Sequence, residues 1–168
     1  MRKITHVGIA AFTAFVVSTS AMAESVTIGL RSEPSSMDPY FHNLGPNNAM
    51  LAQIFGKLID WGPAMDKLIP RLATSWKAIN DTTWEFKLRQ DAKFHDGSDF
   101  TADDFIFSFN RADGYTGGNS SFRTYTKGKT VKKIDDYTIH IMTPGPYPLM
   151  PNEMTSVSYT HLTLPTKA

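Results

Sequence analysis

The period of the hydrophobic pattern changes between Thr83 and Arg111, and this change constrains the fold more than any other feature. In the run TWEFKLR, residues 83–89, apolar and polar side chains alternate strictly, which is typical of a half-buried antiparallel strand. A helix is then indicated by apolar residues at the i, i+3, i+4 and i+7 spacing of one helix face: Ala102, Phe105, Ile106 and Phe109. A strand and a helix so close together predict a domain of mixed α/β class.

Turn and cap residues separate these two elements. Asp96-Gly97 is a turn dipeptide, and Thr101 stands three residues before Asp104, close to the S/T-x-x-E capping box. Asp103 also falls in the first helical turn, where the helix dipole favours negative charge by about 0.3–1 kcal/mol. We therefore expect the helix to begin directly after Thr101.

The same stretch holds a histidine and several carboxylates that have to be considered as metal ligands. Neither an H-E-x-x-H helix nor an EF-hand loop is present. Turn, loop and cap roles account for each of these residues, so we predict that none of them binds metal: His95, Asp96, Asp99, Asp103 and Asp104.

No motif of a catalytic site is recognisable. The chain has no cysteine and no G-x-S-x-G elbow. The glycines of a phosphate loop follow a strand and precede a helix. Those at 114, 117 and 118 lack this context, so they form no phosphate loop. A glycosidase-type carboxylate pair depends on a spacing that only the fold sets, so that alternative stays open. We predict no catalytic residue and no cofactor.

The N-terminus has the three parts of a secretory signal peptide. Arg2 and Lys3 carry positive charge, an apolar run covers residues 7–17, and Ala21-Met22-Ala23 is a small-x-small cleavage site. A transmembrane helix needs about 20 apolar residues, more than this run provides. We expect residues 1–23 to be removed on export and the mature chain to begin at Glu24; a buried N-terminal helix is the alternative.

Charge and cysteine content exclude two classes of protein. An exported chain that has no cysteine cannot be a small domain stabilised by disulfides, so a hydrophobic core has to stabilise it. Lys and Arg total 17 against 16 Asp and Glu, and two of the cations lie in the leader. With no basic run in the chain, we predict no nucleic-acid partner.

Shorter patterns predict the other elements. We expect a strand at 25–30, a strand at 76–79 that forms a hairpin with 83–89 across Asn80-Asp81, and two strands joined at Asp135-Asp136. The Gly/Ser/Thr-rich segment 112–129 is expected to be a long surface loop. An amphipathic helix is expected from Asn47 until Gly62-Pro63, with this apolar stripe: Met50, Leu51, Ile54, Phe55, Leu58 and Ile59.

The C-terminal residues do not continue the upstream pattern. The run VSYTHLTLPTKA resembles a peptide that arises when sequencing-adapter DNA is translated together with a gene fragment. We expect the native sequence to stop near residues 155–157 and residues 158–168 to be a non-native tail. A genuine frayed strand is the alternative.

Residues 81–111, DTTWEFKLRQDAKFHDGSDFTADDFIFSFNR, closely resemble the signature region of the family 5 extracellular solute-binding proteins of bacterial ABC importers. The family pattern has Tyr/Trp-x-Phe-x-Leu-Arg, Lys-Phe-His-Asp-Gly, Phe-Thr-Ala-x-Asp-Phe and Ser-x-x-Arg, and all are present. SMDPY, residues 36–40, resembles the family's Leu-Asp-Pro-His, with Met37 and Tyr40 as departures. Residues 54–76 resemble its Tyr-Glu-Gly-Leu and Pro-x-Leu-Ala-x-Ser-Trp run, although Gly56-Lys57 departs from it.

The resemblance implies a two-lobed receptor that closes on its solute. This chain then corresponds to the N-terminal part, lobe I with its extra subdomain, and the second lobe is missing. Residues 24–56 are expected to start lobe I, and residues 57–157 to form the extra α+β subdomain around the 81–111 motif.

The function that the resemblance implies is a periplasmic receptor that delivers di- or oligopeptides to an inner-membrane ABC permease and its ATPase subunits. We expect a monomer. Nickel complexes, oligosaccharides and opines remain open as solutes. A secreted enzyme and a chaperone-like binder of extended chains are alternatives from other classes.

The resemblance also implies which residues bind the ligand. In the family, the segment after the Asp-Pro motif lines the ligand groove, and here it comprises His42, Asn43, Leu44 and Gly45. An aromatic that the family places over the ligand falls near Ser121 and Phe122. Because the first segment precedes the predicted helix, we expect its backbone N–H and C=O groups to be available to an extended ligand, as in strand addition.

Overall fold

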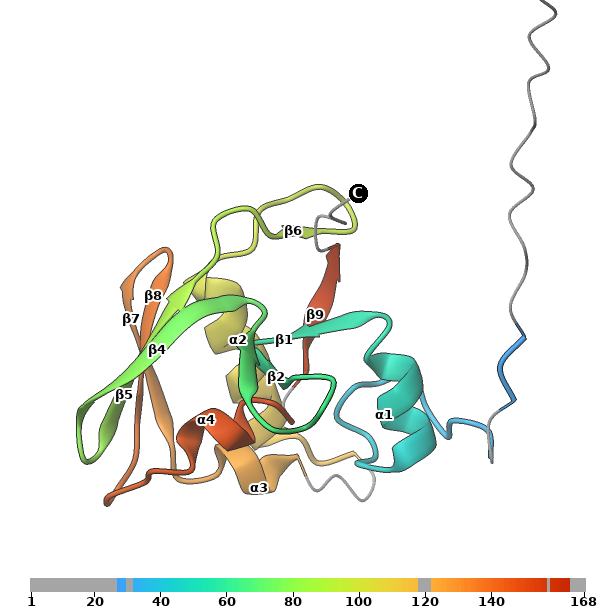
Figure 1. Ribbon diagram of the computed structural model, residues 1–168, viewed down its shortest axis with the longest axis horizontal. Coiled ribbons are helices and arrows are strands. Elements are labelled where there is room, and N and C mark those ends of the chain that lie inside the picture. Colours follow the sequence, from blue (N-terminus) through green and yellow to red (C-terminus); the bar gives the residue numbers. More distant parts are fainter. Residues whose placement is uncertain (1–26, 30–31, 118–121, 157, 164–168) are drawn as a thin grey trace, which may run out of the picture.

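A four-stranded antiparallel sheet in the order β4-β5-β8-β7 forms the centre of the domain (Figure 1). The computed structural model describes residues 27–29, 32–117, 122–156 and 158–163. The mixed α/β class predicted from the sequence is confirmed. The strands of this sheet are β4 Ala73–Asn80, β5 Thr83–Leu88, β7 Thr130–Asp135 and β8 Thr138–Met142.

The central hairpin follows from the alternating pattern. β4 pairs with β5 as predicted, and β5 pairs in turn with β8. Phe86 lies directly opposite Ile139 in that register, and both side chains are fully buried. Apolar residues on one face of these strands thus meet across the pairing, which fixes the register because a one-residue slip would turn them to solvent.

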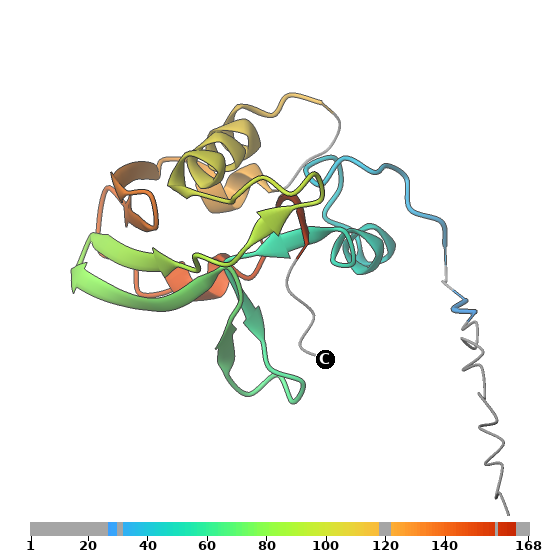
Figure 2. The same ribbon diagram turned by 90° about the horizontal axis from the view of Figure 1, so that it is seen from above.

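Helix α2, Ala102–Gly114, covers one side of the sheet (Figure 2). Its capping box is present as predicted, and the N–H and the hydroxyl of Thr101 both donate to Asp104 Oδ2, at 2.8 and 2.9 Å. Phe105 and Phe109 are buried, whereas Phe107 is 64% exposed on the opposite face. The helix therefore attaches to the sheet through the stripe that the sequence indicates.

Smaller elements surround this centre. β2 pairs with β3, and β9 lies between β1 and β6. Helix α1 lies at the end of the molecule away from the four-stranded sheet (Figure 1). Their bounds are α1 Gly45–Leu51, β1 Phe55–Lys57, β2 Ile59–Trp61, β3 Leu68–Pro70, β6 Lys93–Phe94, α3 Arg123–Thr126, α4 Met150–Glu153 and β9 Ser158–Thr163.

One apolar cluster holds these elements together. It draws aromatic and aliphatic side chains from the sheet, from α2 and α4, and from the segments before α1 and α3. Apolar burial of this kind contributes about 25 cal/mol per Å². Its largest fully buried members are Tyr40, Leu58, Ile59, Leu72, Phe86, Phe100, Phe105, Phe109, Ile139 and Ile141.

The helix predicted from Asn47 is shorter than expected. α1 has Leu44 as its N-cap and Pro46 in its first turn, and it ends at Leu51. Two short strands, β1 and β2, replace the rest of the predicted helix. Strand pairing prevails because β9 and β3 supply backbone partners, while Gly56 disfavours a helix by about 1 kcal/mol relative to alanine. The prediction of one helix up to Gly62 was wrong.

The predicted first strand is also not formed where it can be followed. Residues 27–29 have no regular secondary structure, and Ile28 is 76% exposed. The remaining residues of that run, 25, 26 and 30, lie outside the described residues. A strand needs a neighbour to pair its backbone groups, and no strand of the described part borders residues 27–29.

The Gly/Ser/Thr-rich segment 112–129 is more regular than predicted. It begins with the last turn of α2 and contains α3, whose last residue, Thr126, is buried. Phe122, directly before α3, is buried in the apolar cluster and anchors this short helix. The prediction of one long surface loop was therefore wrong for these parts.

Two predictions about chain organisation stay predictions. The proposed boundary between residues 56 and 57 falls inside β1. Residues 158–163 of the expected tail form β9, which pairs with β1 and β6.

In the described part of the chain, no helix is long and apolar enough to cross a membrane.

Candidate functional site

The segment His42–Gly45 leads into α1, and its residues 42–44 have no regular secondary structure. Leu44 has φ −117° and ψ 147°, and its carbonyl accepts the Asn48 N–H at 2.8 Å. Gly45 is the first residue of α1, so the expectation that the whole segment precedes the helix was wrong for this residue. Among the described residues, the backbone N–H and C=O groups of His42 and Asn43 have no backbone partner.

Side-chain contacts hold this segment in place. His42 Nδ1 lies 2.8 Å from Ser35 Oγ. Asn43 accepts a hydrogen bond from Asn48 Nδ2 at 2.8 Å and donates one to the Tyr125 hydroxyl at 3.4 Å. Because both side chains are bonded to the domain itself, the groups that remain to meet a ligand are those of the backbone.

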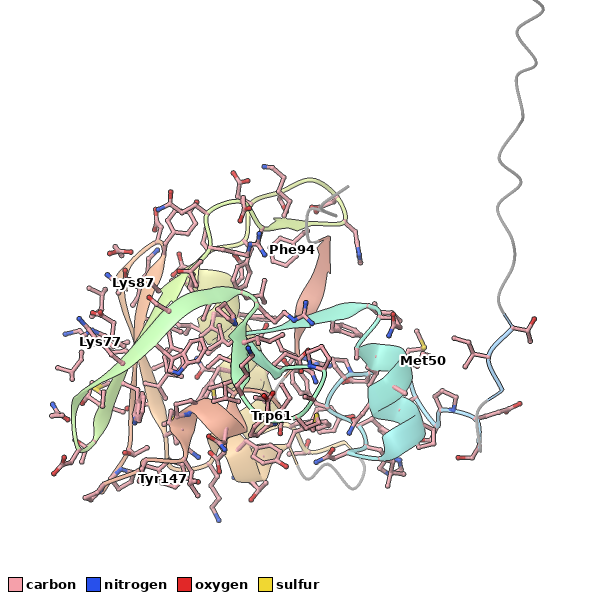
Figure 3. The ribbon with its side chains drawn as sticks, viewed as in Figure 1. Met50, Trp61, Lys77, Lys87, Phe94 and Tyr147 are labelled. Atoms are coloured by element: carbon pink, nitrogen blue, oxygen red, sulfur yellow. The ribbon has the colours of Figure 1, made fainter. Side chains whose placement is uncertain are left out.

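A polar hollow of about 230 Å³ borders Asn43. Complete ligand pockets have about 300–1,000 Å³, so a hollow of this size corresponds to part of a site. Figure 3 shows Trp61, in β2, near the middle of the view, and Met50, on α1, to the right of it. The lining residues are Asn43, Asn48, Lys57, Trp61, Thr155 and Ser156.

Five of these six lining residues were not predicted from the sequence. Lys57 and Trp61 come from the segment that the sequence suggested to be one helix, whereas the structure places them in two strands, β1 and β2. The Lys57 ammonium stands 4.0 Å from Asp60, whose other carboxylate oxygen lies 3.4 Å from Arg71. Thr155 and Ser156 reach the hollow only through tertiary folding, and no local pattern signals that placement.

The second predicted ligand segment is placed differently. Ser121 lies outside the described residues. Phe122 is only 2% exposed, and its ring packs edge-on against Tyr40, with centroids 6.4 Å apart, and against Tyr125. Its contacts are therefore with the domain, and a role of Phe122 over a ligand stays a prediction.

The carboxylates of the central motif bond to protein groups. Asp96 accepts the N–H and hydroxyl of Ser98 at 2.9 and 2.7 Å, and Asp103 pairs with Lys133 at 2.6 Å. Asp99 pairs with Lys93. Within the described residues, no group of three or more His, Cys, Asp or Glu side chains gathers to hold a metal ion.

An ion pair joins the site's segment to α2. Arg111 donates to Asp38 through both terminal nitrogens, at 2.6 and 3.3 Å, and its guanidinium lies 4.8 Å from the ring centroid of Tyr40. Asp38 raises the pKa of Arg111. Burial raises the pKa of Tyr40 to about 12, so this hydroxyl stays neutral at physiological pH.

Comparison with solved structures places this fold in a known class. The crystal structure of Haemophilus influenzae OppA in complex with RPPGFSPFR matches with a TM-score of 0.67 and 27% identity, over 76% of this chain and 29% of that one. Campylobacter jejuni NikZ in complex with Ni(L-His) matches with a TM-score of 0.65 and 25% identity, over 76% of this chain and 25% of the other. The domain is thus part of a periplasmic-binding-protein fold.

Sequence comparison gives the family. The family model described as bacterial extracellular solute-binding proteins, family 5 Middle, matches residues 67–167, and the chain belongs to this family. The periplasmic oligopeptide-binding protein OppA of Haemophilus influenzae is 30% identical over 143 residues, which are 74% of this chain and 26% of the relative. The chain thus spans about a quarter of the length of that relative.

Proposed function

We propose that this chain contributes one wall of the ligand cleft of a periplasmic receptor, which delivers di- or oligopeptides to an ABC importer by closing around them. The observation that carries the proposal is the backbone of His42 and Asn43, which has no backbone partner among the described residues and lies, at Asn43, beside a polar hollow. The names of relatives support the peptide class, since OppA is a periplasmic oligopeptide-binding protein.

Backbone pairing suits a receptor that accepts many peptides. An extended ligand that adds beside His42 and Asn43 gains main-chain hydrogen bonds that do not depend on its side chains. The hollow next to Asn43 is lined by amide, hydroxyl and ammonium groups, which offer partners for the polar ends of a short peptide. Binding is then promiscuous in sequence and limited by length and shape.

The remaining parts of the proposal follow from the family. Receptors of this family bind and release a solute without chemical conversion, so we propose no catalytic step and no cofactor. The partners are an inner-membrane permease and its ATPase subunits, and the receptor acts as a monomer in the periplasm. A nickel complex is the second candidate solute, because NikZ in complex with Ni(L-His) shares the fold.

Calorimetry on the protein expressed from its complete reading frame tests this function. Titration with a mixed di- to pentapeptide library should give saturable heat, whereas a nickel–histidine complex, an opine and an oligosaccharide should give none. If only the nickel complex gave saturable heat, the solute would be a metal chelate and not a peptide. Residues 24–168 by themselves should give no saturable heat at micromolar peptide, because one wall leaves most of the ligand in water.

A further inference from the structure

We propose that Arg111 is a positioning residue for the ligand-binding segment: it holds Asp38, and Asp38 holds the turn that presents the backbone of His42 and Asn43. This inference rests on the proposed function, because it takes those backbone groups as the ones that meet the peptide. It assigns a role to two motif pieces, the Asp-Pro segment and the last residue of the Ser-x-x-Arg run, that lie far apart in the sequence.

The contact between Arg111 and Asp38 is bidentate. Nη2 lies 2.6 Å from Oδ2 and Nη1 lies 3.3 Å from Oδ1, across a separation of 73 residues. The guanidinium also lies over the rings of Tyr40 and Tyr115, with its central carbon 4.8 and 5.8 Å from their centroids. A planar group fixed by two parallel bonds and two aromatic faces has little freedom to turn, and lysine could not reproduce this geometry.

Asp38 passes this constraint to the segment. Its Oδ1 accepts the Tyr40 N–H at 2.9 Å, its backbone carbonyl accepts the Phe41 N–H at 3.2 Å, and its own N–H donates to Ser36 Oγ at 3.0 Å. The carboxylate held by Arg111 is thus the same group that closes the turn directly before His42. A rotation of this carboxylate would release the turn.

A second anchor fixes the base of the segment. Asn47 is 1% exposed, and its amide nitrogen donates to the Ser36 carbonyl at 3.2 Å. Its amide oxygen accepts the N–H and the hydroxyl of Ser35, both at 3.3 Å. The same hydroxyl contacts His42 Nδ1. Asn47 therefore ties the segment to α1, and Arg111 ties it to α2.

The exposure of the ion pair argues for a role in preorganisation. The side chains of Arg111 and Asp38 are 39% and 28% exposed, and exposed ion pairs contribute little to global stability. A rigid binding segment raises affinity because less conformational entropy is lost when the ligand binds. Loss of the pair should therefore appear in local order and in ligand affinity before it appears in the melting temperature.

Two variants and one matched control test the inference in the protein from the complete reading frame. Arg111→Met removes the charge and keeps an apolar stem, while Asp38→Asn keeps an oxygen for the Tyr40 N–H and removes the charge. Arg89→Met is the control, because Arg89 also makes a bidentate contact with an aspartate, through Nε and Nη2 to Asp91 at 2.6 and 2.8 Å, outside this segment. The hydrogen-exchange rates of the Tyr40 and Phe41 amides report how stable the turn is, and this measurement needs no ligand.

We expect Arg111→Met to speed exchange at these two amides at least tenfold and to weaken peptide affinity at least tenfold, with a melting temperature close to that of Arg89→Met. The double variant Asp38→Asn/Arg111→Met should lose little more affinity than Arg111→Met, because the two groups act as one unit. Unchanged exchange and affinity in Arg111→Met would overturn the inference. If the unmodified protein binds no library peptide, the proposed function fails, while exchange still reports whether Arg111 holds the turn.

Discussion

The indole Nε1 of Trp84 donates a hydrogen bond to the backbone carbonyl of Tyr147 at 3.0 Å and so joins β5 to the segment that follows β8. The Tyr147 N–H in turn donates to the Asp81 carbonyl at 3.1 Å. Figure 3 shows Tyr147 at the end of the molecule opposite Met50. These two bonds fasten the proline-rich segment before α4 to the edge of the central hairpin.

Trp84→Phe should lower the free energy of unfolding by about 1 kcal/mol more than Trp76→Phe does, because both changes reduce an indole to a phenyl ring but only the first leaves the partly buried carbonyl of Tyr147 without its donor. Urea unfolding followed by circular dichroism measures the change. Trp76→Phe is the control, since Trp76 lies in the same hairpin and no hydrogen bond of its indole is found among the described residues. An equal loss in both variants would show that ring size, and not the bond, sets the cost.

The capping box of α2 gives a second prediction. Thr101→Ala removes the hydroxyl donor and keeps the N–H bond to Asp104, whereas Asp104→Ala removes the acceptor of both bonds, and each should cost about 1 kcal/mol. The double variant should cost clearly less than the sum, because the two residues act as a unit. Asp103→Ala, which removes an exposed pair with Lys133 and a first-turn charge but no capping bond, should cost less than either. Full additivity in urea unfolding would contradict the coupling.

Alkaline pH should destabilise the protein through Tyr40. Burial raises its pKa from 10.0 to about 12, so between these values the unfolded chain releases a proton that the folded chain keeps. The stabilising contribution is complete below pH 10 and is lost as pH rises towards 12. Tyr40→Phe should therefore flatten the decline of the urea midpoint between pH 9.5 and 11.5. An undiminished slope in this variant would assign the alkaline loss to other groups.

Gly45→Pro should weaken peptide binding at least tenfold, about 1.4 kcal/mol, with little change in the melting temperature of the unliganded protein. Position 45 opens α1, where proline is tolerated because its N–H has no intrahelical partner. The substitution removes a backbone donor beside Asn43 and obstructs the approach of the ligand. Gly45→Ala is the matched control, since a Cβ there meets nothing within 4 Å. Unaltered affinity in a folded Gly45→Pro protein would place the groove elsewhere.

Local patterns were sufficient where neighbouring residues determine the structure. The alternation in residues 83–89, the Thr101–Asp104 cap and the stripe of Phe105 and Phe109 each describe a contact within one element or one hairpin. The β4–β5 hairpin and α2 were predicted for this reason and are confirmed. Family membership was recognisable from the same stretch because a motif of packing and cap residues is contiguous in sequence.

The sequence by itself determined the mixed α/β class, the central hairpin and helix, and the family. The tertiary structure alone decided that residues 55–61 form strands, that Phe122 is buried, and that Arg111 meets Asp38. The physical reason is the range of the interactions. A cap or an alternating strand draws its energy from residues a few positions away, whereas strand pairing with β9 and β3, and an ion pair across 73 residues, depend on partners that only the folded chain brings together.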